Sequence, residues 1–369
     1  MKKNSTVPQS PKRAAGGKEG PITIGMDLGD KASRYCVLGG DDEQWEGSVA
    51  TTKKAITQKF AGMRRCRIAM EVGSHSPWLS RLLTRLGFEV IVANARQVQL
   101  ISASSRKNDR MDARLLARLA RADPKLLRPI RHRGEQAQSD LMAVRIRASL
   151  VEARTGLVNA ARGFAKAVGE RLPSCDADAL GVEKMEVLPA ALQERLRPLL
   201  EQVESLTAQI KKLDSSIEQI ARSSYPETEL LRQVSGVGIL IALTFVLTVE
   251  DRERFQKSRD VGCYVGLRPK QSESGQSQPQ LRITKEGDRY LRTLLVQGAH
   301  IILNRRGPDT DLKRWGLKLA SHGGKNAKKR AIVAVARKLA ILLHRLWVTG
   351  EVYEPLRNSR AVRSRKKAA

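Results

Sequence analysis

The feature that most restricts the fold of this chain is a run of nine aliphatic residues at alternating spacings of four and three. This heptad spacing predicts one long helix whose apolar stripe packs against another helix. With Leu196 at position a, the β-branched residues Val203, Ile210 and Ile217 share that position and the d positions are mostly leucine, which favours two parallel strands. The nine residues are Leu192, Leu196, Leu199, Val203, Leu206, Ile210, Leu213, Ile217 and Ile220.

The sequence leaves the partner of this helix open. One arrangement is a parallel coiled coil with the same helix of a second chain. The other is an antiparallel hairpin with an earlier helix, predicted over residues 135–168. We expect the intermolecular pairing, and therefore a homo-oligomer that is a dimer or a dimer of dimers.

The residues before these helices predict an α/β domain. Two short apolar runs, 22–26 and 67–70, each indicate a buried strand that ends in an acidic residue, Asp27 or Glu71. Further strands are predicted over 35–38, 44–49 and 88–92, and helices over 53–63 and 78–86, the latter stopped by Gly87. The predicted order is three strands, a helix, a strand, a helix, a strand and a further helix.

Asp109 and Asp112 lie three residues apart on the predicted further helix. Two like charges at this spacing cost a helix a few tenths of a kcal/mol, roughly, unless a cation lies between them. Clustered carboxylates suit Mg²⁺ or Mn²⁺, and two such ions about 4 Å apart can clamp the attacking and leaving oxygens of a phosphodiester. We therefore predict that Asp27, Glu71, Asp109 and Asp112 bind metal, the alternative being that they are turn or helix-capping residues.

The charge of the chain indicates a polyanionic partner. There are 67 Lys and Arg against 38 Asp and Glu, for a formal net charge of +29. This excess suits a protein that neutralises many phosphates. Aromatic residues make up only 4%, so we expect phosphate contacts to dominate over base stacking.

Other compositional features exclude several classes. The four cysteines show no CxxC spacing, which argues against structural zinc and against a disulfide framework and indicates a reducing cytoplasm. The polar, basic segment 1–20 lacks the apolar core of a signal peptide, and we expect it and the basic tail 354–369 to be unstructured. The longest apolar stretch, 239–249, is shorter than the roughly 20 residues of a membrane span, so we expect a buried helix or strand and no membrane partner.

A further, mainly helical domain is predicted after Tyr225-Pro226. The segment 230–242 contains Gly236-Val237-Gly238 between apolar runs and resembles a helix-hairpin-helix, in which glycines let backbone N–H groups approach a phosphate. Tight packing of two helices is the alternative explanation for these glycines.

A polar loop in this domain contains Ser272, Ser274 and Ser277, and such a loop is usually a flexible connection. Basic residues on both sides of it are placed to neutralise a phosphate and to stabilise a pentavalent transition state. A third basic group opens a later helix, where its unfavourable position in the helix dipole would be relieved by a phosphate. The predicted nucleic-acid-binding residues are Arg268, Lys270, Arg282, Lys285, Arg289, Arg292, Lys325, Lys328 and Lys329.

Several of these segments resemble the DEDD transposases of the IS110 and IS1111 insertion-sequence group, which includes the Piv-type DNA invertases. The N-terminal resemblance is carried by the segments 25–28, 70–74, 86–94 and 107–113, which contain the four acids. The C-terminal resemblance is carried by the segments 266–275 and 283–292. The motifs occur in order in two domains and span nearly everything from Ile22 to Tyr353.

The resemblance implies a RuvC-like, RNase H-like fold for the N-terminal domain and a DNA transposase or recombinase activity. It implies that the four acids hold divalent metal and that Ser274, at the Ser-Gly step, attacks DNA and forms a phosphoserine link. Ser272 is the nearest alternative nucleophile, because the family often has a second small residue where Glu273 stands. It also implies a structured guide RNA that pairs with the element ends and the target DNA, in the bacterial cytosol and associated with the nucleoid.

The expected organisation is a basic tail (1–20), a RuvC-like DEDD domain (21–170), a linker and coiled coil (171–224), a serine transposase domain (225–353) and a second basic tail (354–369). Because the two predicted sites lie on different domains, we expect a composite site in which Ser274 of one protomer meets the acids of another. Two alternatives keep the same residues: a metal-dependent RNase H-like nuclease or junction resolvase that uses water, and a non-catalytic scaffold that binds nucleic acid.

Overall fold

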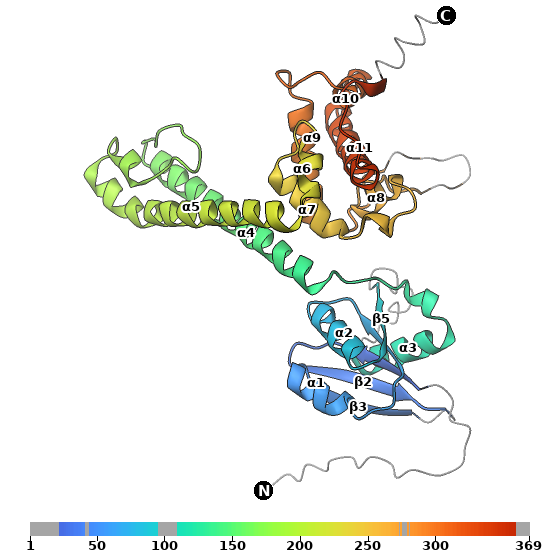
Figure 1. Ribbon diagram of the computed structural model, residues 1–369. Helices are drawn as coiled ribbons and strands as arrows, with labels where there is room; N and C mark the ends of the chain where they lie inside the picture. The colour runs from blue at the N-terminus through green and yellow to red at the C-terminus, as the bar shows by residue number, and fades with distance from the viewer. Residues whose placement is uncertain are drawn as a thin grey trace, which may run out of the picture. The chain divides into compact units, whose positions relative to one another are not determined.

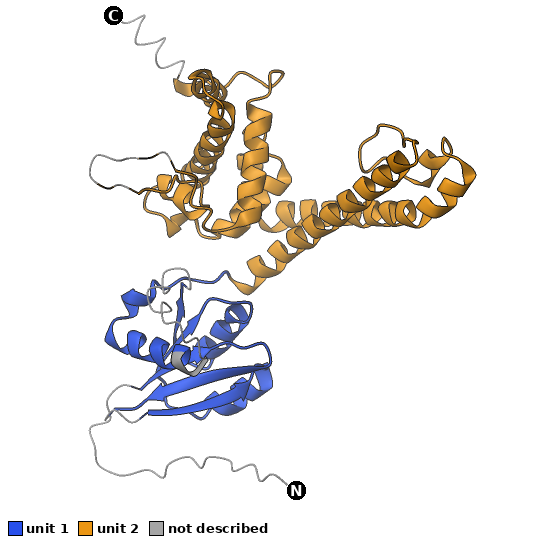
Figure 2. Cartoon of the chain, turned by 180° about the vertical axis from the view of Figure 1, so that it is seen from behind, with its two compact units in different colours: residues 1–133 blue, residues 134–369 orange. Residues whose placement is uncertain are grey.

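The computed structural model describes residues 22–40, 44–94, 109–272, 274, 279 and 281–358, with the side chains of residues 109–111 left out of that description. The predicted tail 1–20 and residues 359–369 of the second tail lie outside the described residues. The chain divides into two compact units, Met1–Arg133 and Gly134–Ala369, which are coloured separately in Figure 2 and described one at a time below.

Unit 1 is built on one five-stranded mixed sheet with the strand order β3-β2-β1-β4-β5 (Figure 1). The first three strands pair antiparallel, and β4 and β5 join them parallel to β1. This arrangement confirms the predicted α/β class of the N-terminal part. The strands are β1 (Thr23–Asp27), β2 (Ala32–Leu38), β3 (Gln44–Ala50), β4 (Arg67–Glu71) and β5 (Glu89–Ala93).

Helices α1 (Lys53–Phe60) and α2 (Ser76–Arg85) cover one face of the sheet. The Thr52 hydroxyl caps α1 by accepting a hydrogen bond from Ala55 N, and α2 is followed by Gly87, whose φ of 89° lets the chain turn into β5. The core between these helices and the sheet consists mainly of apolar side chains, and alternate strand residues face it. Its strand residues include Ile24, Met26, Val37, Ile68 and Met70.

Helix α3 (Asp109–Ala122) covers the opposite face of the same sheet. The buried residues of this helix follow a helical stripe and are mostly alanine, which lets the helix backbone lie close to the strands. They are Ala113, Leu116, Ala117 and Ala120, and they pack on Cys36, Leu38, Ala69 and Ile91 of the sheet.

Unit 2 begins with two long helices, α4 (Glu135–Ala167) and α5 (Ala190–Ser224), that pack on each other as an antiparallel hairpin (Figure 1). Polar contacts fix the register along its length. The Arg147 guanidinium donates to Asp214 Oδ1 at 2.8 Å, and Arg154 donates to Thr207 Oγ1 at 3.1 Å. The segment between the helices contributes Leu180 and Met185 to a small core at the tip of the hairpin.

The predicted long helix is therefore present, but its apolar stripe packs on α4 of the same chain. The four residues predicted at position a are all buried in the hairpin: Leu196, Val203, Ile210 and Ile217. This is the hairpin alternative left open by the sequence. The parallel intermolecular coil expected from the heptads is not the arrangement seen, because these residues already have a partner within the chain. The oligomeric state itself stays a prediction.

The boundary between the units lies at Arg133 and Gly134, earlier than the predicted end of the first domain at residue 170. The physical reason is that α4 packs with α5 and with α7 (Ile239–Val249) and not with the sheet. Helix α4 therefore belongs to unit 2.

The rest of unit 2 is helical, as predicted for the C-terminal part. Helix α7 is the apolar segment predicted to be a buried helix or strand, and residues 241–249 of it are all buried. Helix α11 also runs through the core, where Leu339 and Leu343 are fully buried. The α-helices of this part of unit 2 are α6 (Glu227–Arg232), α7 (Ile239–Val249), α8 (Arg259–Tyr264), α9 (Arg289–Ile302), α10 (Asp311–Ser321) and α11 (Ala327–Thr349).

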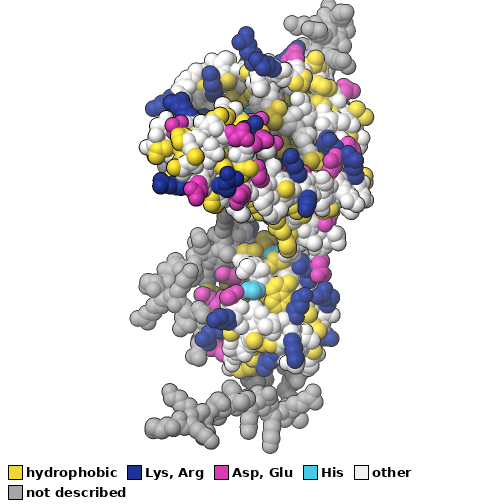
Figure 3. All heavy atoms as spheres, turned by 90° about the vertical axis from the view of Figure 1, so that its left-hand side faces the viewer, with side chains coloured by type: hydrophobic (Ala, Val, Ile, Leu, Met, Phe, Trp, Pro, Cys, Tyr) yellow, Lys and Arg dark blue, Asp and Glu magenta, His cyan; other side chains and the backbone are white. Residues whose placement is uncertain are grey.

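Over the described residues, none of the helices combines the length and apolarity that crossing a bilayer requires. On the face drawn in Figure 3, Lys and Arg side chains are interspersed with acidic and apolar ones. The excess of positive charge in the sequence is therefore not gathered into one continuous patch on that face.

Candidate functional site

Two of the predicted metal ligands lie side by side at the carboxyl end of the sheet. Met26 of β1 is in register with Met70 of β4, so the next residues along these parallel strands are Asp27 and Glu71. Neighbouring strands are about 4.8 Å apart, which brings the two acidic positions to adjacent places on the edge. Both are half-buried. The structure therefore brings together two acids that are far apart in sequence.

Helix α3 approaches β1 on the same face of the sheet. A Cβ atom built on Gly25 would lie 2.0 Å from the Ala113 carbonyl oxygen and 2.5 Å from Ala117 N, so only glycine permits this contact. Since side chains alternate along a strand, Asp27 projects from the face that Gly25 presents to the helix. Glu71 projects from that face too, because Ala69 packs on α3.

The direction of α3 places its first residues near these acids. The Arg67 guanidinium at the start of β4 donates to the Ala120 carbonyl at 2.9 Å, whereas Ala113 meets Gly25 further along the sheet. The helix therefore runs antiparallel to β1 and β4, with its beginning toward their carboxyl ends. Asp112 is half-buried one residue before Ala113.

Asp109 is the first residue of α3, and its side chain lies outside the described residues. Among the side chains that the structure describes, no group of three or more His, Cys, Asp or Glu could hold a metal ion. The donor chemistry fits a hard divalent cation, because the residues at this edge are carboxylates. The backbone fits as well, since two strand ends and the beginning of one helix meet there.

The loop after Glu71 is held by a hydrogen-bond network at the same edge. The buried Ser76 hydroxyl donates to the Gly73 carbonyl at 2.8 Å and accepts from Gly73 N at 2.9 Å. His132 Nε2 lies 2.8 Å from the same hydroxyl. His75 Nε2 lies 3.3 Å from Asp30 Oδ1 in the loop after β1. The hydrogen bonds of Ser76 hold the backbone that follows Glu71.

The predicted nucleophile lies on a two-stranded ribbon in unit 2. Pro269 and Ile283 form an antiparallel bridge, Lys270 N donates to the Arg282 carbonyl, and Thr284 N donates to the Arg268 carbonyl, both at 2.9 Å. The chain between these two sides is the Ser-rich loop. Ser272 and Ser274 are both exposed there, and Glu273, Gly275 and Ser277 lie outside the described residues.

Two glycines brace the base of this ribbon. Gly266 has a φ of 70°, and a Cβ atom on it would lie 2.1 Å from the Glu286 carbonyl oxygen. Gly287 has a φ of 71°, and its Cβ atom would lie 2.0 Å from the Tyr264 carbonyl oxygen. No side chain could be accommodated at either position without movement of the backbone. The two glycines that flank the predicted serine motif are thus explained by close backbone packing.

Two charged residues of the second motif also have structural roles. Asp288 caps α9 by accepting from Leu291 N at 2.8 Å, and it forms an ion pair with Arg145 of α4. Arg292 was predicted to bind nucleic acid. In the structure its guanidinium donates to the carbonyls of Val265 and Glu286, at 3.0 and 2.7 Å, and ties the base of the ribbon together, and its contact with nucleic acid stays a prediction.

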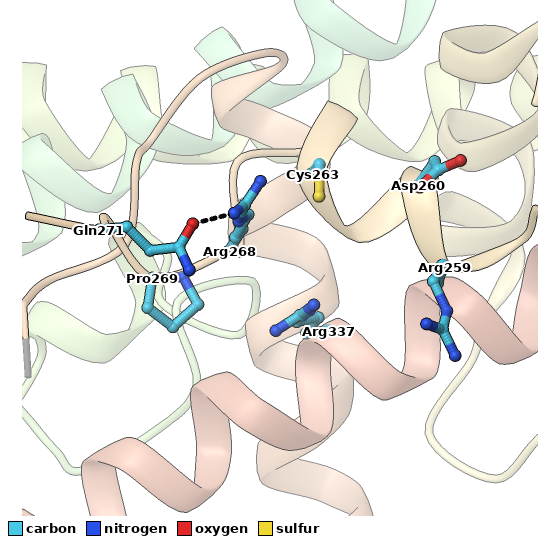
Figure 4. A pocket seen from close by; sticks show the side chains of 7 residues that line it. All are labelled: Arg259, Asp260, Cys263, Arg268, Pro269, Gln271 and Arg337. Atoms are coloured by element: carbon cyan, nitrogen blue, oxygen red, sulfur yellow. Dashed lines mark hydrogen bonds between the residues drawn. The ribbon is translucent and has the colours of Figure 1, made fainter. Parts of the chain in front are cut away.

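A hollow of ≈ 460 Å³ lies at the foot of the ribbon, and three arginines from three elements line it (Figure 4). Arg259 comes from α8, Arg268 from the ribbon and Arg337 from α11, and Asp260 is the one carboxylate among the described lining residues. Arg268 donates a hydrogen bond to Gln271. Arg337 Nε is buried and has no hydrogen-bond partner within the described part of the chain.

A larger groove of ≈ 1630 Å³ adjoins this hollow and shares Arg259, Pro269 and Arg337 with it. No carboxylate occurs among its described lining residues, while eight cationic residues do. Three of these, Arg282, Lys285 and Lys329, were predicted from the sequence. The eight are Lys257, Arg259, Arg282, Lys285, Lys329, Arg330, Arg337 and Lys338.

The other predicted phosphate-binding residues do not line the groove. Lys270, Arg289, Lys325 and Lys328 are exposed on the surface. The groove also contains five cationic residues that were not predicted from the sequence: Lys257, Arg259, Arg330, Arg337 and Lys338. Lys257 and Arg259 lie at the start of α8 and the other three on α11, so they meet only when these two helices pack together.

Comparison with known proteins gives matches in both units. The family described as DEDD transposase (IS110) matches residues 24–168, and the Transposase IS116/IS110/IS902 family matches residues 228–313. The chain is 29% identical to the transposase for insertion sequence element IS1111A of Coxiella burnetii, over 89% of this chain and 90% of the relative. It is 28% identical to a probable family 20 transposase of Pseudomonas aeruginosa, over 90% and 98%.

A third relative decides the assignment. The chain is 30% identical to the putative transposase y4pF/y4sB of Sinorhizobium fredii, over 78% of this chain and 74% of that protein. This chain is a transposase of the IS110/IS116/IS902 family. The resemblance that the sequence motifs carried is therefore confirmed, and with it the expectation of an enzyme that acts on DNA.

The N-terminal family match of the transposase extends to residue 168 and includes α4, although α4 packs in unit 2. The family region thus contains the sheet, the acids and the first helix of the hairpin. In this transposase the region matched by the N-terminal family therefore extends from unit 1 into unit 2.

The two glycines of the segment that resembles a helix-hairpin-helix differ in their packing in this transposase. Helices α6 and α7 are joined by a short turn in which Gly236 has a φ of 85°. A Cβ atom on Gly236 would lie 2.8 Å from the Gly298 carbonyl oxygen of α9. This observation supports the packing alternative for Gly236. Gly238, which precedes α7, is exposed, and phosphate contact there stays a prediction.

Two histidines are expected to make the stability of the transposase depend on pH. Burial lowers the pKa of His132 in unit 1 and of His344 in unit 2. Each imidazole is therefore neutral in the folded protein at a pH where it binds a proton in the unfolded chain. We expect the two histidines to make their full contribution to the free energy of unfolding above about pH 6.5, the ordinary pKa of histidine. The free energy of unfolding should fall as the pH drops below that value.

Urea unfolding of wild type and of His344→Gln between pH 5 and pH 8 measures this effect. The variant should show a smaller loss of stability on acidification than wild type. Equal slopes in the two proteins below pH 6.5 would contradict the assignment of this pH dependence to His344.

Proposed function

We propose that this transposase cuts and rejoins DNA at the ends of an insertion sequence with a metal-binding acidic site in unit 1 and a serine nucleophile in unit 2. The observation that carries the proposal is the meeting of Asp27, Glu71 and the beginning of α3 at one edge of the sheet. As a transposase the protein binds DNA, and the element ends and the target are its proposed substrates.

We further propose that unit 1 has an RNase H-like, RuvC-like fold. Three antiparallel strands followed by two parallel ones, in the order β3-β2-β1-β4-β5, support this proposal. So does the position of the acids at the carboxyl ends of the two central parallel-paired strands, β1 and β4.

In the proposed site Asp27, Glu71, Asp109 and Asp112 hold Mg²⁺ or Mn²⁺. When bound, such an ion neutralises charge that develops on the phosphodiester and polarises its oxygens. The acids would hold such an ion beside the DNA strand, and the hydrogen bonds between Ser76 and Gly73 would hold the backbone that follows Glu71.

In unit 2 the proposed nucleophile is Ser274. Its hydroxyl oxygen attacks phosphorus, the bond from phosphorus to the leaving deoxyribose oxygen breaks, the leaving oxygen takes up the proton that the serine hydroxyl loses, and a phosphoserine ester forms. The energy of the broken ester is kept in the new one, so a second deoxyribose hydroxyl can reverse the step and rejoin strands. The exposed position of Ser274 on the ribbon, and the three-arginine hollow at its foot, support this role.

Trapping the covalent intermediate tests the serine. The full chain is incubated with element-end DNA, the cognate structured RNA and Mg²⁺, then denatured and examined for protein-linked DNA. We expect an adduct with wild type and with Ser272→Ala, and none with Ser274→Ala. Ser272 is a matched control because it is exposed on the same loop, two residues away. Undiminished cleavage by Ser274→Ala without an adduct would favour a nuclease that uses water.

We also propose that the functional site is composite, with Ser274 of one protomer meeting the acids of another, in a dimer or a dimer of dimers guided by a structured RNA. Mixing Asp27→Ala protein with Ser274→Ala protein should then restore strand transfer that neither variant performs alone. A mixture as inactive as its components would show that the site is assembled within one chain.

A further inference from the structure

The large groove of unit 2 has two chemically different kinds of lining. Its cationic side chains suit phosphates, but the ribbon and α10 add a group of apolar side chains, among them Leu281, Ile283, Trp315 and Leu319. Leu281 is 36% exposed, so part of its side chain is accessible where it lines the groove. A ligand that satisfies the whole groove must therefore present both negative charge and apolar surface.

A base-paired duplex does not meet that requirement. Its outer surface carries phosphates and sugars, while the flat faces of its bases are stacked inside. A duplex in the groove would neutralise the cations and leave the apolar side chains in water. An unpaired strand presents phosphates and base faces together.

Trp315 and Lys338 place an apolar ring and a positive charge in direct contact at the groove. Lys338 Nζ lies 3.9 Å from the centroid of the Trp315 ring, and both residues line the groove. The ammonium group of α11 thus lies over one face of the Trp315 ring of α10, and both side chains border the groove. Proteins that bind single strands combine aromatic side chains with a cationic track.

We propose that this groove binds an unpaired nucleic-acid strand, with its phosphates on the cations of α11 and at least one base against Trp315 and Leu281. The inference rests on membership of a DNA-binding family and is independent of the metal and serine chemistry. The ligand is a strand of DNA or RNA that is not base-paired where it crosses the groove.

Equilibrium binding of the full chain to short fluorescent oligonucleotides tests the proposal without metal and without an element end. The probes are an unpaired strand and an abasic strand of the same length and charge. Wild type should bind the unpaired strand about tenfold more tightly than the abasic strand, because one stacked base contributes on that scale. Deoxyribose and ribose versions of both probes reveal which kind of strand is preferred.

The variants separate base contacts from phosphate contacts. Trp315→Leu and Leu281→Ser should both lose the preference for the unpaired over the abasic strand and keep the salt dependence. Arg282→Gln should weaken both probes alike and lower the slope of log K against log salt by about 0.7. Leu317→Ser is the matched control, since Leu317 is 47% exposed on α10 and does not line the groove.

The proposal is overturned if wild type binds abasic and unpaired strands of both kinds equally. It is also overturned if Trp315→Leu and Leu281→Ser both retain the wild-type preference. Because none of these measurements requires strand cleavage, failure of the serine mechanism would leave their outcome unchanged.

Discussion

Asp27→Asn is expected to reduce DNA cleavage by the transposase at least about 1,000-fold while leaving DNA binding nearly unchanged. The substitution keeps the size of the side chain and removes one negative charge from the edge where β1, β4 and α3 meet. Transition-state charge stabilisation by a bound divalent ion is worth several kcal/mol, and about 4 kcal/mol corresponds to this factor in rate. Phosphate contacts elsewhere, in the groove of unit 2, should preserve affinity.

Cleavage of element-end DNA as a function of Mg²⁺ concentration, together with equilibrium binding, measures this effect. Asp30→Asn is a matched control, because Asp30 is an acid three residues further along the chain with a side chain that is 91% exposed. The control should cleave at close to the wild-type rate. If Asp27→Asn retained more than a tenth of wild-type cleavage, the acidic edge would not be the catalytic centre.

Gly25→Ala is expected to destabilise unit 1 by about 3 kcal/mol or more and to abolish cleavage as well. The added Cβ atom would lie 2.0 Å from the backbone oxygen of Ala113, so α3 has to move as a body. Overpacking in a rigid core costs about 1–3 kcal/mol and more when only backbone can yield. The displaced helix carries Asp112 away from the ends of β1 and β4.

Hydrogen exchange of the sheet residues in the full chain isolates this loss from the stability of unit 2. Gly62→Ala is the matched control, since nothing lies within 4 Å of a Cβ atom built there. The strands of Gly25→Ala should exchange much faster than those of the control. Equal protection in both variants would mean that α3 does not depend on its contact with Gly25.

The sequence predicted unit 1 well because its signals are local. A buried strand that ends in an acid, as at Asp27 and at Glu71, indicates both the element and the position of its functional group. The alternation of residues along β1 and β4 also indicates which face of the sheet each side chain lies on. Gly25 and Ala69, both small, lie on the face that packs against α3. What the sequence could not give is the closeness of that helix, which follows from a three-dimensional contact.

The partner of the long helix was harder to predict, because a heptad stripe does not specify what covers it. The a residues are buried as expected, but Leu200, Thr207 and Ala221 are buried beside them, whereas the d residues are only partly covered. The buried stripe is therefore rotated relative to an a/d seam. Contacts such as that of Arg147 with Asp214 join α5 to α4. The heptad spacing of α5 does not show which helix supplies such contacts.

The candidate site in unit 2 shows the same limit. Arg292 has the charge of a phosphate ligand, yet two backbone carbonyls take up its guanidinium at the base of the ribbon. Arg337, in contrast, lies within an apolar helix pattern and gave no signal, although it lines both the hollow and the groove. Charge in the sequence identifies a class of partner, and only packing decides which cations face it.

The ion pair of Arg145 with Asp288 has a mechanical consequence. Asp288 follows directly on Gly287 at the base of the serine ribbon, and Arg145 also stacks 5.0 Å from the ring centroid of Tyr290 in α9. Helix α4 is the first element after the chain leaves unit 1. The contacts of Arg145 with Asp288 and Tyr290 therefore tie helix α4 to the base of the ribbon within unit 2, so that neither can shift relative to the other without breaking this ion pair.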